Sequence, residues 1–153
     1  MAKFDFNGID TLIADFEKLA VIDEETTYSI LGAGAEAMRT VWQAVIRRMG
    51  LMDPKNPQLI NSLELQKKRS PVEGYYIRVM PYGPRKDRNR SHRRRKAGGF
   101  YTNTNDEVGF LLEYGTPRIK ARHWMETAND IAYEDTAEAM QEAWNEHLDD
   151  LNL

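Results

Sequence analysis

Apolar residues recur at alternating spacings of four and three along one stretch of the chain, from about residue 27 to residue 49. They are Leu31, Ala35, Met38, Trp42, Val45 and Met49. This spacing places them on one face of an α-helix, where the small residues from Gly32 to Ala35 allow another backbone to approach closely. Thr26 or Thr27 is expected to cap the start of the helix, and Gly50 to end it.

A shorter amphipathic helix is expected near the N-terminus, over residues 8–20. Its apolar face consists of Ile9, Leu12, Ile13, Phe16 and Leu19. The acidic and polar residues 23–27 interrupt the pattern before the longer helix begins. Residues 1–25 are therefore interpreted as an N-terminal arm that carries this short helix.

Strand patterns occupy the middle of the chain. Apolar and polar residues alternate over Ser62–Lys67 and Glu73–Met80, and strand-forming residues return over Phe100–Thr104 and Glu107–Tyr114. The side chains expected to point inward from the first two strands are Leu63, Leu65, Tyr75, Ile77 and Val79. The polar residues 103–106 are expected to form a turn between the last two strands.

A long helix is predicted at the C-terminal end, from about His123 to Leu148. Its expected buried positions are Trp124, Ala128, Ile131, Met140, Trp144 and Leu148. The order of elements predicts an α+β fold, with N-terminal helices and a long C-terminal helix packed on a small antiparallel sheet. Residues 1–153 are expected to form a single domain, from which a long basic inter-strand loop, residues 81–99, protrudes.

The composition is that of an ordinary globular domain. The chain has 153 residues, of which 41% are hydrophobic and 29% are charged. It contains no run of about twenty apolar residues, so no membrane span is expected. The N-terminus lacks the long apolar core of a secretory signal. The absence of cysteine excludes disulfides, thiol nucleophiles and thiolate metal sites.

Charge is strongly segregated along the chain, although the net charge is only −3. Residues 85–96 contain a single acid and eight basic residues, which are Arg85, Lys86, Arg88, Arg90, Arg93, Arg94, Arg95 and Lys96. Residues 124–153 contain nine Asp or Glu and no Lys or Arg. A chain with one basic loop and one acidic end is suited to head-to-tail contacts between copies of itself.

No pattern typical of an enzyme or a metal site is present. The serines lie in no nucleophile-elbow context, and residues 32–34 lack the lysine or third glycine of a phosphate cradle. His147 beside Glu142 or Glu146 is a weak metal candidate, because acidic helix faces with one histidine are common. The carboxylates of the last helix are spaced like a solvated face. Neither an enzyme, nor a cofactor, nor a metal is expected.

The most informative motif follows the last predicted strand. It consists of Glu113, Tyr114, Gly115, Thr116 and Pro117. Gly115 can take backbone angles that other residues avoid, and Pro117 cannot continue a strand ladder, so the chain must bend here. The segment ARHWMETA, residues 121–128, then opens the last helix. The bend is predicted to be structural, setting the position of that helix.

These two segments together resemble the signature of a family of bacteriophage proteins, the tail-component or neck proteins of long-tailed phages. In that family an aromatic-flanked E-[FY]-G-T is followed by a short basic spacer and by A-R-P-F-[ML]-x-x-A at the start of the last helix. Residues 113–116 match the first part, and residues 121–128 match the second.

The chain departs from the family pattern at several positions. His123 stands where the family usually has Pro, and Trp124 where it usually has Phe. Pro at the first turn of a helix is favourable but dispensable. A weaker likeness to the family's T-G-x-L-x-x-S-[IL] lies at residues 56–63, with Pro57 in place of Gly and Ile60 in place of a basic residue.

The resemblance covers roughly residues 26–150 and implies a structural protein of the virion. Such a protein forms a homo-oligomeric ring, with a hexamer favoured over a dodecamer, in the phage neck. There it completes the tail and joins the head-side connector or stopper to the tail tube or tail terminator, after assembly in the bacterial cytoplasm. The resemblance also implies that the bend lies near subunit contacts. Trp124, Met125 and Ala128 are expected to dock the last helix.

The basic residues from Arg85 to Lys96 admit three interpretations. They dock against an acidic surface, such as residues 124–153 of a neighbouring subunit, or they contact the phosphates of DNA in the ring lumen, or they form a solvated loop. A different class of function is a nucleic-acid-binding module with this basic run as its main element. The overall pI of about 5.7 argues against a dedicated DNA-binding protein.

Overall fold

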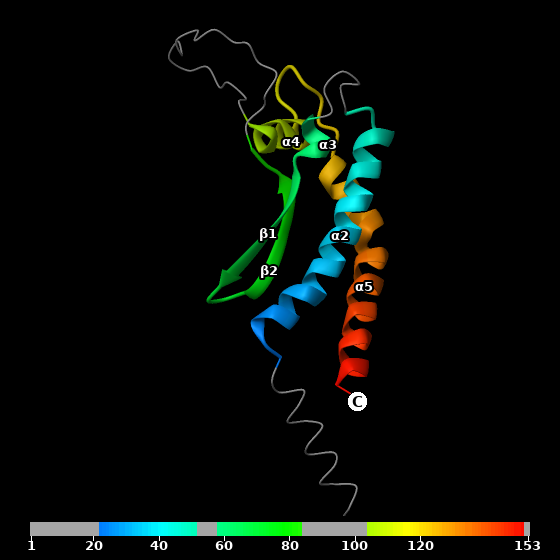
Figure 1. Cartoon of the computed structure of the whole chain (residues 1–153). Coiled ribbons are helices and arrows are strands. Elements are labelled where there is room, and N and C mark those ends of the chain that lie inside the picture. Colours follow the sequence, from blue (N-terminus) through cyan, green and yellow to red (C-terminus); the bar gives the residue numbers. More distant parts are fainter. Residues whose placement is uncertain (1–21, 52–57, 84–103, 152–153) are drawn as a thin grey trace, which may run out of the picture.

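The computed structural model describes residues 22–51, 58–83 and 104–151 (Figure 1). Its elements are α2 (Glu24–Arg48), α3 (Gln58–Asn61), β1 (Leu63–Ser70), β2 (Gly74–Pro81), α4 (Asn105–Tyr114) and α5 (Trp124–Asp150). The helix predicted over residues 8–20 and the basic run at residues 85–96 lie outside the described residues, as does most of the strand predicted at residues 100–104.

Helix α2 confirms the helix predicted from the four-and-three spacing, but its cap is Asp23 rather than Thr26 or Thr27. The Asp23 Oδ1 atom accepts a hydrogen bond from the Thr26 backbone N–H at 2.7 Å. Aspartate is among the strongest N-capping residues, and two glutamates in the first turn favour the positive end of the helix. Helix α2 therefore begins at Glu24, three residues earlier than predicted.

Strands β1 and β2 form a two-stranded antiparallel hairpin, as the alternation predicts. Leu63 pairs with Pro81, and Leu65 with Val79, so these side chains share one face. That face packs against α2. The Tyr28 hydroxyl of α2 donates a hydrogen bond to the Lys68 carbonyl oxygen at 2.9 Å, which ties the helix to the hairpin near its turn.

The prediction of a strand over Glu107–Tyr114 is wrong, because this segment belongs to α4. Its buried residues Asn105, Gly109 and Glu113 are spaced four apart, which is helical periodicity. The predicted turn at residues 103–106 is also wrong, since α4 begins at Asn105. The described elements on either side of the basic run are therefore β2 and α4, not two strands.

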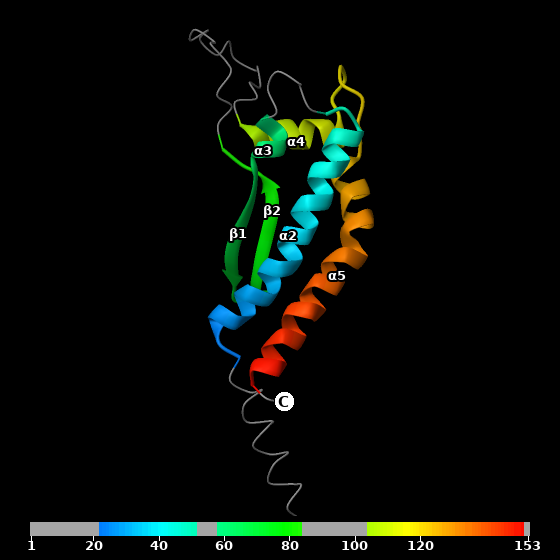
Figure 2. The same cartoon turned by 45° about the vertical axis from the view of Figure 1, so that its right-hand side comes forward.

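The elements are arranged in layers, with α2 between the hairpin and α5 (Figure 1; Figure 2). Helices α2 and α5 run antiparallel and make the largest helix–helix contact of the described chain, while α3 and α4 lie at one end of the layers. The α+β class is confirmed. The long C-terminal helix, however, packs on α2 rather than directly on the sheet.

Close packing of the two helices depends on small residues. A Cβ atom added to Gly34 of α2 would lie 2.5 Å from the Met140 Cγ atom of α5. Ala128 and Ala132 are fully buried on α5. Ile131, predicted to be buried, is 44% exposed, because the contact ridge of α5 follows the four-residue row through Ala128 and Ala132.

The hydrophobic core lies where α2, α3, the hairpin and the start of α5 meet. Its buried members are Ala35, Trp42, Val45, Ile46, Leu59, Ile60, Leu63, Val79, Trp124 and Ala128. Seven of these were predicted from the apolar spacing, namely Ala35, Trp42, Val45, Leu63, Val79, Trp124 and Ala128. None of the described helices combines the length and the apolar character needed to cross a bilayer.

Candidate functional site

The motif at residues 113–117 lies at the junction where the chain leaves α4 and enters α5. Gly115 ends α4 with φ 73° and ψ −176°, a region that is essentially open to glycine only. A Cβ atom at this position would lie 2.6 Å from the Ala121 backbone nitrogen and 2.7 Å from the Ile119 carbonyl oxygen. The predicted bend is therefore present and requires glycine, although it follows a helix rather than a strand.

A tight turn follows Gly115. Thr116 and Ile119 exchange two backbone hydrogen bonds, of 2.8 and 3.1 Å. Pro117 occupies the second position of this turn, where its fixed φ is favourable. The Thr116 hydroxyl oxygen accepts hydrogen bonds from the backbone N–H groups of Arg118 and Ile119. Thr116 and Pro117 thus stabilise the turn itself, as predicted for a structural bend.

The returning chain satisfies carbonyl groups that the end of α4 would leave without partners. The Arg122 N–H donates to the Leu112 carbonyl oxygen at 2.8 Å, and the His123 N–H to that of Glu113 at 3.3 Å. The Arg122 guanidinium also donates to the Met49 carbonyl oxygen, at the C-terminal end of α2, at 2.7 Å. One segment therefore joins the ends of α2 and α4 to the start of α5.

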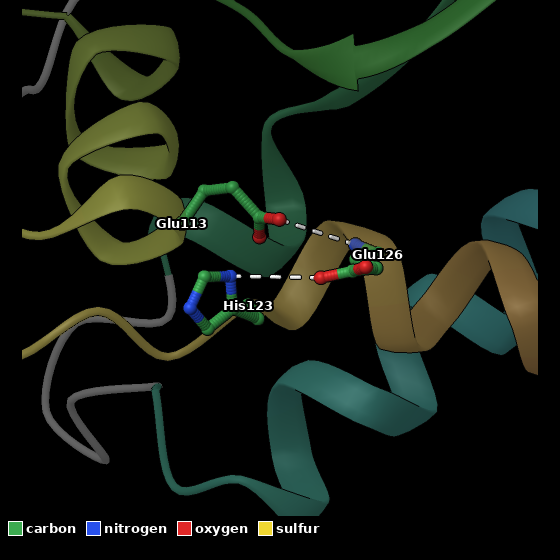
Figure 3. A group of neighbouring side chains, drawn as sticks. All are labelled: Glu113, His123 and Glu126. Carbon is green, nitrogen blue, oxygen red and sulfur yellow. Dashed lines mark hydrogen bonds and ion pairs between the residues drawn. The ribbon is translucent and has the colours of Figure 1, made fainter.

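Glu113 provides the cap of α5 from the end of α4. Its side chain is 5% exposed. One carboxylate oxygen accepts from the Met125 N–H at 2.6 Å. The other accepts from the Glu126 N–H at 3.3 Å (Figure 3). The carboxylate thus satisfies two free N–H groups at the positive end of the helix dipole. The residue that precedes α5, His123, makes no side-chain capping bond.

His123 has a backbone conformation that proline cannot adopt. Its φ is 47° and its ψ is 42°, in the left-handed region, whereas the proline ring holds φ near −65°. The residue is the N-cap of α5, not part of its first turn. The interpretation of this position as a first-turn site where Pro is dispensable is therefore wrong for this chain.

Trp124, Met125 and Ala128 lie at the start of α5, where docking was predicted. Trp124 is fully buried, its indole N–H donates to the Gly109 carbonyl oxygen at 3.0 Å, and its ring meets the Trp42 ring edge-to-face at 5.2 Å. Met125 is partly buried against the same core, and Ala128 is fully buried. These side chains fix α5 against α2 and α4.

Tyr114 is the member of the motif that faces outward. It is 70% exposed and stacks on Phe110, one turn earlier in α4, which is 46% exposed. The pair makes a small aromatic surface beside the bend. It contributes little to the core, so its role in the junction differs from that of Glu113 and Gly115.

Glu113, His123 and Glu126 bring possible metal-ligand atoms within 4.8 Å of one another. His123 Nδ1 lies 3.6 Å from a Glu126 carboxylate oxygen, and both side chains are largely exposed. The Glu113 carboxylate, however, already accepts two N–H groups at the positive end of α5, which favours anions over cations. The geometry is that of a helix cap, and no metal chemistry is assigned to it.

Sequence reasoning missed two partners of this junction. The Glu113 carboxylate was assigned to a bend, not to a helix cap, although the absence of Ser, Thr, Asp or Asn directly before α5 signals that a cap must come from elsewhere. Gly109 was not singled out at all. Its added Cβ atom would lie 3.1 Å from Pro81 and 3.2 Å from Met125, so small size is needed there.

The predicted contact residues Arg85 to Lys96 lie outside the described residues. No protein-family model, curated protein or solved structure matches the chain.

Proposed function

We propose that the chain is a structural subunit of a phage virion, forming a ring in the neck that joins the head-side connector to the tail tube. The support comes from the residues through which it resembles the neck family. Glu113, Gly115 and Trp124 all serve one packed junction that sets the direction of α5. A subunit that acts mechanically needs such a junction, because it must hold its helices in a fixed direction.

The proposed role is not catalytic. Within the described residues, the buried charged side chain is Glu113, and both of its oxygens are occupied by backbone N–H groups. A general acid or base needs a free site for a proton and an adjacent space for a substrate. A subunit that acts by its contacts needs neither of these.

A ring with heterologous contacts requires two different surfaces on each subunit. The chain provides a basic run at residues 85–96 and an acidic helix α5, which has nine carboxylates and no Lys or Arg. We favour a hexamer, in which every subunit contacts one neighbour by each surface. The other partners would be the connector or stopper and the tail tube or tail terminator.

Cryo-electron microscopy of the particle that carries the chain tests this proposal. A symmetric ring between portal and tail tube, into which α2 and α5 can be traced, is the expected result and would give the number of subunits. Particles that lack the chain, or that carry it elsewhere than in the neck, would rule the proposed function out.

The composition of the basic run favours a second candidate, a nucleic-acid-binding module. The run has eight Lys or Arg in twelve residues, which can bind the phosphates of a nucleic acid whatever its base sequence. Such a module would bind duplex DNA as the free protein, and its affinity would fall by several decades between about 50 and 200 mM salt. A neck subunit is expected to show little DNA binding of this kind. Fluorescence anisotropy with labelled DNA separates the two functions.

A further inference from the structure

Helix α5 carries an unbroken row of carboxylates. At every fourth position there is an acid, and the seven acids of this row are Glu126, Asp130, Glu134, Glu138, Glu142, Glu146 and Asp150. All seven residues are exposed. We call this set the acidic row. Positions four apart are neighbours on a helix, so the row is a continuous ridge of like charge.

The first four acids of the row, from Glu126 to Glu138, lie opposite the ridge by which α5 packs on α2. That ridge also repeats every four residues, and it starts two residues earlier, with Trp124, Ala128 and Ala132. Two residues correspond to about 200° around a helix, which is close to the opposite side. The row then winds toward α2, because a step of four residues turns about 40° beyond a full revolution. At its C-terminal end, Glu146 and Asp150 line a pocket with Glu25 and Thr26 of α2. Helix α2 lies between α5 and the hairpin (Figure 1; Figure 2).

The described cations leave this row without an ion pair along most of its length. Beyond the contact of Glu126 with His123, no ion pair is found on the row within residues 22–51, 58–83 and 104–151. Several cations elsewhere are already engaged: Lys67 lies over the Tyr28 ring and Arg69 over the Tyr75 ring. Like charges four apart destabilise a helix, so a positively charged partner would relieve the repulsion within the row.

The basic run is opposite to the row in charge, but the segment that contains it starts from another side of the molecule. Asn105 joins the two ends of the segment that contains the run. Its backbone N–H donates to the Gly83 carbonyl oxygen at 3.0 Å, and its side-chain amide donates to the carbonyl oxygens of Tyr82 and Gly83. This anchor lies where β2 meets α4. The first four acids of the row lie on the side of α5 that is turned away from α2, which favours a contact with a second molecule.

We propose that the acidic row of α5 is the docking surface for residues 85–96 of a second copy of this chain. The inference rests on the proposed ring and names the two surfaces that meet in it. The row offers seven carboxylates to eight Lys or Arg and one acid. Arginine forks can bind carboxylates in pairs, and a ridge of carboxylates along a helix gives them successive positions.

Charge-reversal variants of the full chain test this contact. The first variant, Glu138→Lys with Glu142→Lys, reverses the centre of the row. Its matched control is Asp135→Lys with Asp149→Lys, which makes the same charge change at exposed positions of α5 outside the row. The second variant, Arg93→Glu with Arg94→Glu, reverses part of the run. Its control is Arg118→Glu with Lys120→Glu, two exposed residues of the turn before α5.

The oligomeric state is measured by sedimentation velocity at low salt, with circular dichroism to check that each variant folds. The wild type and both controls are expected to associate, and each row or run variant alone is expected to sediment as a monomer. Mixing the two variants must restore association, because each then offers the other a surface of opposite charge. Raising the salt concentration must weaken association of the wild type.

Three outcomes would overturn the proposal. A wild type that remains monomeric at low salt removes the contact altogether. Variants that associate as well as their controls show that copies meet through other surfaces, and the neck function would remain open. A mixture that stays monomeric while the wild type associates shows that the row and the run do not bind each other. Microscopy of the particle tests the neck function separately, so its outcome does not depend on these sedimentation results.

Discussion

At the scale of the residue, the Glu113 side chain carries the link between α4 and α5. Replacing it by alanine leaves the Met125 and Glu126 N–H groups without their acceptors in a partly buried place. Glu113→Ala is therefore expected to lower the free energy of unfolding by about 1–3 kcal/mol. Urea unfolding measures this, with Glu126→Ala as the control at an exposed carboxylate. Equal losses in the two variants would contradict the capping role.

Gly115 allows a second prediction at the same scale, with Gly50 as its matched control. Both glycines have positive φ, 73° and 63°, but an added Cβ atom meets nothing within 4 Å at Gly50 and meets backbone atoms at Gly115. Gly50→Ala pays only for the backbone conformation, about 1–2 kcal/mol. Gly115→Ala is expected to cost more than that, because Ala121 and Ile119 must also move. Thermal unfolding of both variants would refute this if their losses were the same.

Single residues also show what the sequence can predict about the junction. The glycine and proline of the bend act through their own backbone angles, so their role can be inferred from local pattern alone. The cap of α5 cannot, because Glu113 is separated by twelve and thirteen positions from the N–H groups it binds. The capping role of Glu113 depends on how α4 and α5 cross, and no local sequence pattern specifies that crossing.

At the scale of the element, α4 explains why the fold was predicted only in part. Residues 107–114 are short and apolar, and a run of that length fits a buried strand and a helix about equally well. The contacts of Gly109 with Pro81, Met125 and Trp124 lie far away in sequence and favour the helix. The long helices α2 and α5 were predicted because their apolar positions repeat over many turns.

The contact of α2 with α5 is tested by two glycines in the same turn of α2. An added Cβ atom at Gly34 lies 2.5 Å from Met140, whereas at Gly32 its nearest neighbour is Ile77 at 4.0 Å. Alanine is a better helix former than glycine by about 1 kcal/mol. Gly32→Ala is expected to raise the melting temperature, and Gly34→Ala to lower it by pushing α5 away. A rise in both variants would contradict the close packing.

The start of α2 predicts a dependence on pH. Hydrogen bonds from the Thr26 backbone and then from its side chain hold the pKa of Asp23 below its ordinary value of 3.8. A lowered pKa in the folded state means that the cap stabilises fully above about 3.8 and loses this effect as the pH falls through the lower, folded value.

The gap in melting temperature between the wild type and Asp23→Ala should therefore narrow as the pH falls below 3.8. Asparagine caps a helix without a charge, so the gap between Asp23→Asn and Asp23→Ala should stay constant over the same range. Differential scanning calorimetry at several pH values measures both gaps. A wild-type gap that does not change with pH would mean that the Asp23 carboxylate is not the cap.

At the scale of the whole molecule, the acidic row is expected to lower the stability of the single chain and to favour its association with other copies. Glu138 has Glu134 and Glu142 as neighbours four positions away on either side, and all three are exposed. Each pair of like charges at this spacing costs about 0.2–0.5 kcal/mol, so removing the charge of Glu138 relieves two such pairs.

Glu138→Gln is therefore expected to raise the free energy of unfolding of the monomer by about 0.4–1 kcal/mol and, at the same time, to weaken self-association at low salt. Urea unfolding at high salt and high dilution measures the first effect, and sedimentation velocity the second. Asp135→Asn removes an equal charge from outside the row and should leave association unchanged. A variant that is more stable and associates as strongly as the wild type would mean that the row is a solvated face, because its repulsion would then serve no contact.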